Sequence, residues 1–368
     1  MMRRYFAILT ILLLVYSCSS SDTDPSGGST DNFDRSTLLA NVADNMAKPV
    51  FADLKAKLED LKTKFDSFNS TPNTTTFTAV KTSWLNAYKV WQYAAIFEIG
   101  KAEELQFVNH FNIYPVTVAD VDNNISTGTY DLNSTNNHDA QGFPALDYLF
   151  FGVAATETDI IAKYTTDANA SNYKKYVNDV IAKMTDIATE ISDDWNGSYR
   201  EDFVSNSGNT ATSALNKFVN DFIFHYEKRL RANKFGIPVG NFSAAPLPEK
   251  VEAFYAKQYS KELALDALAA VNNVFSGRAY GSSATGASFQ TYLNSLSKST
   301  LSTSITNQFE SARTQINTLS ASLYEQINTN NQPVLMAYDE LQKAVVLLKV
   351  DMLQAFNVSV DFVDADGD

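Results

Sequence analysis

The sequence predicts an all-α fold, in which two helical bundles pack together with little or no sheet. Apolar residues recur at three- and four-residue steps through most of the chain, as they do on the buried face of a helix. No segment alternates apolar and polar residues over the length of a strand. The chain has 368 residues, which is more than one hydrophobic core usually serves, so two domains are the expectation.

The helical stripes give the expected elements in order. Two long helices come first, and the second carries Trp84, Tyr88 and Trp91 on one face. The last helix begins at Pro333, because proline suits the first helical turn. The expected helices cover residues 38–68, 77–97, 173–191, 215–230 and 305–327, followed by the one from Pro333.

Three irregular stretches separate these helices, at residues 109–142, 195–209 and 233–248. The middle one ends in turn-forming residues and divides two helical sets of similar size, so we expect an N-terminal bundle over 33–204 and a C-terminal bundle over 205–368. The other two stretches are long for connections within a bundle. Because long ordered loops are often functional, we look for the site there.

The N-terminus predicts a lipoprotein signal peptide over residues 1–17. Arg3 and Arg4 precede an apolar run that is too short to span a bilayer, and the only cysteine, Cys18, follows this run. Cleavage before Cys18 would let that residue carry acyl chains, and two or more chains hold a protein stably on a membrane. An ordinary secretory signal with an incidental cysteine is the alternative. Residues 18–32 would then form a polar, flexible stalk.

These features place the protein in the cell envelope, lipid-anchored to the outer membrane on its periplasmic or its surface face. The formal net charge is −13, and a surface of that sign repels nucleic acid and anionic lipid head groups. We therefore expect no nucleic-acid partner, and membrane attachment through the lipid of Cys18 alone. With that thiol acylated, no cysteine is left for a disulfide.

The three histidines do not form a zinc-protease motif, since no two have the required helical spacing. His225 lies in an expected helix and is interpreted as a core histidine. His110 and His138 lie in the first long loop and could meet Asp139 or Asp147 in space, although we favour exposed positions for both. The sequence contains neither a nucleophile elbow nor a phosphate-binding glycine loop. Near the C-terminus, Asp364, Asp366 and Asp368 resemble the opening of a calcium loop or form an acidic tail.

Residues 142–152, GFPALDYLFFG, resemble the signature segment of the imelysin family, which reads Gly-x-His-x-x-Glu followed by an aromatic and apolar run that ends in glycine. Further similarity lies at Trp84, Trp91, Ile99-Gly100, Tyr114-Pro115-Val116, 234–240 and 356–358. The resemblance covers nearly all of the chain after the stalk. It implies an all-helical two-bundle fold, a site in the cleft between the bundles, and a cell-envelope protein linked to iron uptake.

Two departures from the family pattern bear on mechanism. Pro144 stands where the family has histidine, and Asp147 stands where it has glutamate. Proline offers no lone pair to a metal, whereas a hydrolytic zinc site normally needs three protein ligands. A further family glutamate corresponds to Ala95, with Glu98 one turn later. We therefore expect no peptidase activity.

Pro144 should begin a helix that docks Leu146, Leu149 and Phe150 into the first bundle. Asp147 would lie near the N-terminus of that helix, either as a carboxylate stabilised by the helix dipole or as part of a ligand-binding cleft. Lys234 and Arg231 could face Asp147, although we favour solvated cations. The expected cleft residues are Asp147, Tyr148, Tyr114, Arg231 and Lys234.

The functional hypothesis is an envelope lipoprotein that binds a ligand without catalysis, in the acquisition of iron or another nutrient. Iron or another divalent metal ion is the expected ligand, and an uptake-system protein is a possible partner. One alternative is a metallopeptidase with replaced ligands, drawn from His110, His138, Asp139 and Asp147. Another is a helical module that holds a partner protein at the membrane.

Overall fold

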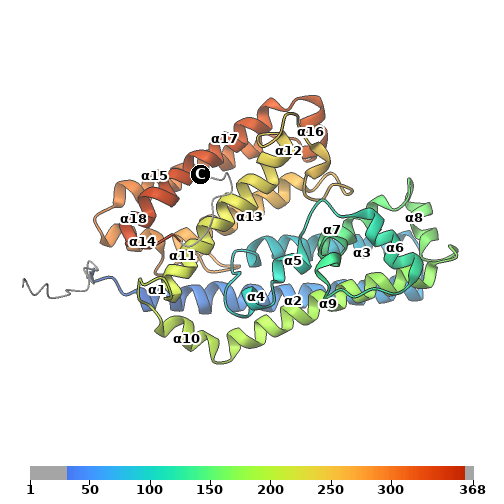
Figure 1. Ribbon diagram of the computed structural model, residues 1–368, viewed down its shortest axis with the longest axis horizontal. Helices are drawn as coiled ribbons and strands as arrows, with labels where there is room; N and C mark the ends of the chain where they lie inside the picture. The colour runs from blue at the N-terminus through green and yellow to red at the C-terminus, as the bar shows by residue number, and fades with distance from the viewer. Residues whose placement is uncertain (1–30, 361–368) are drawn as a thin grey trace, which may run out of the picture. The chain divides into compact units, whose positions relative to one another are not determined.

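The computed structural model describes residues 31–360, and its regular elements there are all helices (Figure 1). Within this part of the chain the only β-type pairing is an isolated bridge between Arg278 and Thr285. The all-α prediction is confirmed. None of the helices between residues 31 and 360 is both long enough and apolar enough to cross a membrane. The predicted signal peptide, Cys18 and the aspartates from Asp364 on lie outside the described residues.

A first group of helices packs around α2. Helix α2 contacts both α3 and α9, and its buried face carries a leucine and phenylalanine stripe from Phe51 to Phe68. The turn into α3 is fixed by a capping box, in which Asn73 and Thr76 each bond the other's backbone. The group comprises α1 (Arg35–Val42), η1 (Ala43–Ala47), α2 (Lys48–Ser70), α3 (Thr74–Ala94) and α9 (Ala170–Asn196). The helices predicted over 38–68, 77–97 and 173–191 are confirmed.

A second group packs around α17, which contacts α15 and the π-helix η4. Pro333 lies in the first turn of α17, as predicted. The stripe over 305–327 is two helices, so a single helix there is wrong. Ser322 accepts a hydrogen bond from the backbone of Glu325 and starts the second helix. The group comprises α11 (Ala214–Phe224), η4 (His225–Gly236), α13 (Ser260–Ser276), α15 (Ser299–Asn317), α16 (Leu323–Thr329), α17 (Gln332–Val346) and η6 (Leu347–Met352).

Short helices fill the connections. The stretch 109–142, expected to be irregular, contains two of them, and the stretch 195–209 contains one. These short helices are α4 (Lys101–Glu104), α5 (Phe107–Phe111), α6 (Val118–Thr127), η2 (Thr135–Ala140), α7 (Gly142–Asp147), η3 (Tyr148–Gly152), α8 (Glu157–Lys163), α10 (Tyr199–Ser205), α12 (Ile237–Val239), η5 (Pro248–Lys250), α14 (Phe289–Ser295) and α18 (Leu353–Phe356).

The two groups of helices belong to one compact unit, Asn32–Asp368. Helix α3 of the first group packs on α13 of the second, and this contact joins them. The segment between η5 and α13 then crosses from the second group to α7, where the candidate site lies. A division into two domains at residues 204 and 205 stays a prediction.

Candidate functional site

The segment that resembles the family signature begins at a glycine that no other residue could replace. Gly142 has φ +74°, a conformation that L side chains rarely adopt. A Cβ atom there would lie 2.3 Å from the carbonyl oxygen of Phe111. Helix α7 therefore lies directly on the end of α5, and this close approach fixes where the following residues point.

Aromatic side chains dock α7 and η3 into the first helix group. Phe143 stacks on Tyr88 with ring centroids 4.4 Å apart, and its carbonyl accepts a hydrogen bond of 3.3 Å from Nε1 of Trp84. Phe150 packs against Phe65 and Phe77. Leu146, Leu149 and Phe150 are all buried, so the predicted docking of this segment is confirmed.

Asp147 is buried and holds two backbone amides of a distant segment. Its Oδ2 accepts a hydrogen bond of 2.9 Å from the N–H of Tyr255, and its Oδ1 accepts one of 2.8 Å from the N–H of Ala256. Burial raises the pKa of Asp147 to about 7, while the two hydrogen bonds oppose that shift. Helix α7 begins at Gly142 and not at Pro144, so Asp147 lies in the second turn of the helix and not, as expected, within the first.

The segment from Val251 to Ala256 carries an unusual backbone. Ala253 has φ 55°, a left-handed conformation that is uncommon for residues with a side chain. The ring of Tyr255 packs directly on Gly152, where a Cβ atom would lie 2.0 Å from Cδ1 of the tyrosine. Both glycines of the signature segment are thus required by close contacts, one at α5 and one at Tyr255.

A cavity of about 150 Å³ lies between α7 and this segment. Its lining residues include Tyr114, Asp147 and Glu249, whose side chains carry oxygen atoms, and none of them is a lysine, arginine or histidine. The cavity is lined by Tyr114, Pro115, Val116, Pro144, Asp147, Glu249, Val251, Ala253, Phe254 and Tyr255. The site therefore combines an aromatic and apolar wall with acidic and phenolic oxygen donors.

Behind this wall, the carboxylate of Glu252 gathers buried polar partners. It forms an ion pair with Lys234 and accepts hydrogen bonds from Asn112, at 2.8 Å, and from Gln92, at 3.2 Å. Lys234 also donates to Gln92 at 2.8 Å. Burial and the charge of Glu252 raise the pKa of Tyr114. Lys234 is buried and paired with Glu252, so the expectation of a solvated cation is wrong at this position.

Arg231 lies in the second helix group, away from the cavity lining. Its side chain is fully buried, donates to the hydroxyl of Tyr338 at 2.6 Å and to Gln342, and pairs with Glu227 at 3.2 Å. The expectation of a solvated cation is therefore wrong here too, because opposite charge and hydrogen bonds compensate the desolvation. Tyr148 donates its hydroxyl to Asp122 at 3.0 Å and touches the site only through its ring contact with Tyr255.

His110 and His138 do meet, with ring centroids 4.7 Å apart. His110 is buried and contacts Gln141 at 3.2 Å, so its expected exposure is wrong, and burial lowers the pKa of both rings. The nearby Asp139 accepts a hydrogen bond of 2.6 Å from Thr117. Across residues 31–360 no three His, Cys, Asp or Glu side chains are grouped so as to hold a metal ion. The donor set therefore does not fit a three-ligand hydrolytic zinc site.

Two further residues considered in the sequence, His225 and Glu98, do not line the cavity. His225 is buried, as expected for a core histidine, and burial together with nearby cations lowers its pKa to about 3. It starts the π-helix η4. Glu98 pairs with Arg229, whose charge opposes the rise in the pKa of Glu98 that burial causes.

Comparison with known protein families shows to which family the chain belongs. The sequence profile of the imelysin family, peptidase family M75, matches residues 47–349, which include α7, the cavity wall and the buried Lys234. The chain belongs to the imelysin family. The segment that carries Pro144 and Asp147 lies within the matched residues, and both residues line the cavity.

Two solved structures share the imelysin fold with this chain. One is a candidate iron-regulated protein A precursor from Parabacteroides distasonis ATCC 8503, with a TM-score of 0.73 and 15% identity over 89% of this chain and 97% of the other. The other is an imelysin-like protein from Psychrobacter arcticum 273-4, with a TM-score of 0.70 and 17% identity over the same shares. No curated protein matches the sequence.

Sequence reasoning identified Tyr114 and Asp147 in the cavity wall, but it missed the opposite wall. Glu249 lies in η5, and Phe254 and Tyr255 follow it in a segment without helical period. Asp147 binds this segment through backbone amides. A sequence feature that could have indicated this wall is the pair of adjacent aromatic residues, Phe254 and Tyr255, that follows Pro246 and Pro248.

Proposed function

We propose that this imelysin-family protein binds a hard metal cation, ferric iron first among them, in the cavity beside Asp147, and catalyses no reaction on it. The observation that carries the proposal is the composition of the cavity wall. The lining residues include Asp147 and Glu249, which carry carboxyl groups, and Tyr114 and Tyr255, which carry phenols, and none has a nitrogen or sulfur side-chain donor. Oxygen donors suit hard cations, whereas imidazole and thiolate select softer transition metals.

The size of the cavity favours a small ligand. A water molecule takes about 30 Å³ of liquid volume, so about 150 Å³ holds an ion together with a few of its waters. Drug-sized ligands occupy pockets of about 300 Å³ or more. A partly hydrated ion held by one or two carboxylates is a common arrangement for hard cations.

The local charge also favours a cation. Glu249 is exposed at the cavity and has no ion pair among residues 31–360. The buried Lys234 is paired with Glu252, and Arg229, whose charge acts on Tyr114, is paired with Glu98; neither cation lines the cavity. With a formal net charge of −13, the whole chain attracts cations over a longer range.

Binding without hydrolysis follows from the same residues. Pro144 supplies no metal ligand, and each oxygen of Asp147 already accepts a backbone hydrogen bond. These bonds leave Asp147 able to contact a cation but fix its orientation toward Tyr255 and Ala256. A water-activating site needs further protein ligands that this wall does not contain.

The proposed setting is the cell envelope, where Cys18 would anchor the protein to the outer membrane by its lipid and an uptake-system protein would receive the ion. This role rests on the sequence of residues 1–32 and on the name of the Parabacteroides protein, which refers to iron regulation. Mass spectrometry of the mature N-terminus tests the anchor. Acylated Cys18 is the expected result, and an unmodified or internal N-terminus contradicts it.

Isothermal titration tests the binding function. We expect the purified protein to bind one equivalent of ferric iron, supplied as its nitrilotriacetate complex, and to bind zinc and copper more weakly. Glu249→Gln should weaken ferric binding about tenfold, the loss expected when one charged ligand is removed. Glu59→Gln, which changes an exposed glutamate of α2, is the matched control and should leave binding unchanged.

Two results would contradict the proposal. One is the absence of binding to ferric, ferrous, zinc, copper or calcium ions. The other is metal-dependent cleavage of a peptide substrate that is lost in Asp147→Ala, which would assign the protein to the metallopeptidases.

A further inference from the structure

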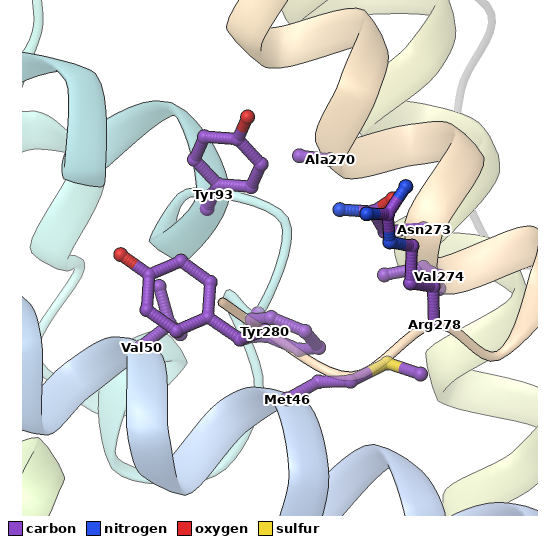
Figure 2. A pocket seen from close by; sticks show the side chains of 9 residues that line it. Met46, Val50, Tyr93, Ala270, Asn273, Val274, Arg278 and Tyr280 are labelled. Atoms are coloured by element: carbon purple, nitrogen blue, oxygen red, sulfur yellow. The ribbon is translucent and has the colours of Figure 1, made fainter. Parts of the chain in front are cut away.

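A second pocket lies where α2, α3 and α13 approach one another, and none of its lining residues belongs to the cavity beside Asp147 (Figure 2). Its narrow inner end has a volume of about 20 Å³ and is mainly apolar. It opens through Tyr93, Asn273, Arg278 and Tyr280 into a wider mouth of about 530 Å³. The inner end is lined by Met46, Val50, Tyr93, Phe97, Ala270, Asn273, Val274, Arg278 and Tyr280.

Two tyrosine rings form an aromatic wall. Tyr93 of α3 and Tyr280 of the loop after α13 meet edge to face, with ring centroids 5.7 Å apart. Their hydroxyl groups bind aspartates outside the pocket, Tyr93 to Asp266 at 3.2 Å and Tyr280 to Asp53 at 2.6 Å. The ring faces and edges are therefore held in place, and they offer a surface on which a flat apolar group can stack.

Arg278 supplies the charge of the pocket. Figure 2 shows its guanidinium group beside Asn273, directed into the space that separates α13 from Tyr93. No carboxylate among the described residues forms a salt bridge with Arg278, although the protein is strongly acidic. The nearby Asp266 and Asp53 are instead engaged by the tyrosine hydroxyls. An arginine fork next to a side-chain amide matches the planar geometry of a carboxylate.

The loop that carries Arg278 and Tyr280 is fixed before any ligand binds. Nε of Arg278 donates to the carbonyl of Ser282 at 2.8 Å, and the N–H of Tyr280 donates to the carbonyl of Asn45 at 2.8 Å. Gly277 makes the turn out of α13 with φ +78°, where a Cβ would lie 2.4 Å from the carbonyl of Gly286. Because little ordering remains to be done on binding, such a pocket can hold a small ligand.

We infer that this pocket binds a small aromatic carboxylate, whose ring stacks against Tyr93 and Tyr280 while its carboxylate is held by Arg278 and Asn273. The ring lies in the wider mouth, because the inner end lined by Val50, Phe97 and Val274 is too small to admit it. The ligand is organic and anionic, so this site differs in chemistry and position from the proposed cation site.

Isothermal titration with benzoate and 4-hydroxybenzoate tests the inference, with benzamide as the uncharged analogue. The expected result is saturable one-to-one binding of at least one acid, with benzamide at least about tenfold weaker. Arg278→Gln should weaken binding of the acid about tenfold or more. Arg313→Gln is the matched control, since Arg313 is an exposed arginine of α15 paired with Glu310 and outside the pocket.

Thermal unfolding of each variant separates loss of binding from loss of folding, and Tyr280→Leu gives a second change on the aromatic wall. Weaker binding of the acid in both folded variants, with Arg313→Gln unchanged, supports the site. Absence of binding by both acids at 10 mM, about the weakest affinity that titration resolves, overturns it. Equal binding of benzoate and benzamide also overturns it, as does binding that Arg278→Gln leaves intact.

Discussion

Two regions of this protein bury charged side chains, and they do so in different ways. Around Arg231, the guanidinium meets the carboxylate of Glu227 and the polar groups of Tyr338 and Gln342. Around Asp147, the carboxylate meets only two neutral backbone amides and lies in the wall of a cavity. The first arrangement compensates charge inside the fold, whereas the second places a buried acid beside a space that a cation can fill.

This contrast separates a structural role from a binding role. A buried ion pair is costly to break but does not by itself indicate a ligand. A buried acid with a raised pKa next to a cavity is the usual mark of a functional site. Arg231 and Glu227 therefore fit a structural role, and the proposed cation site uses Asp147, Tyr114 and Glu249.

The largest expected effect tests the structural side of the comparison. Arg231→Met should lower the free energy of unfolding by about 3–5 kcal/mol, because it removes one partner of a buried ion pair and leaves the carboxylate of Glu227 buried without the charge of Arg231. Arg313→Met, at an exposed pair with Glu310, should cost at most about 1 kcal/mol. Urea unfolding measures both. Equal, small losses in the two variants would contradict the structural role.

A smaller effect is expected where the signature segment meets α5. Gly142→Ala should lower the free energy of unfolding by about 2–3 kcal/mol, since its backbone has φ +74° and a Cβ would collide with the carbonyl of Phe111. Gly208→Ala is the control, because a Cβ there meets only an ordinary contact at 3.6 Å. Similar stability of the two variants in chemical unfolding would show that α7 is free to move off α5.

The pH dependence of stability tests the buried state of Asp147. Its pKa of about 7 in the folded protein lies above the ordinary value of 3.8, so between these values the unfolded chain has lost the proton that the folded chain keeps. Raising the pH across this window should therefore destabilise the native protein relative to Asp147→Asn, by at most about 1.4 kcal/mol per pH unit.

Unfolding of the two proteins from pH 4 to pH 9 gives this difference directly. The free energy of unfolding of the native protein, minus that of Asp147→Asn, should fall up to about pH 7 and then stay constant. A difference that rises with pH would mean that the two backbone amides hold the carboxylate in its charged form.

The sequence predicted the helical fold because apolar periodicity determines which face of each helix is buried. It also predicted the docking of α7 by Leu146 and of η3 by Phe150, and both side chains are buried. Periodicity alone gave a wrong result at Ser322. The apolar spacing continues across this residue, but its side chain caps a new helix, so one expected helix is two.

The site was only half predictable, and the reason is chemical. Asp147 binds the backbone amides of Tyr255 and Ala256, and a backbone amide leaves no mark in the sequence. Burial of Lys234 depends on a partner at Glu252, in a segment without helical period. The pocket at Arg278 joins residues of α2, α3 and α13 that only the tertiary fold brings together.

Anomalous diffraction at the iron edge, from crystals soaked in ferric nitrilotriacetate, tests the central claim most directly. The account predicts a single strong peak in the cavity, within bonding distance of oxygen atoms of Tyr114 and Glu249. A peak at His110 and His138, or no ordered iron in the cavity at saturating concentration, would contradict it.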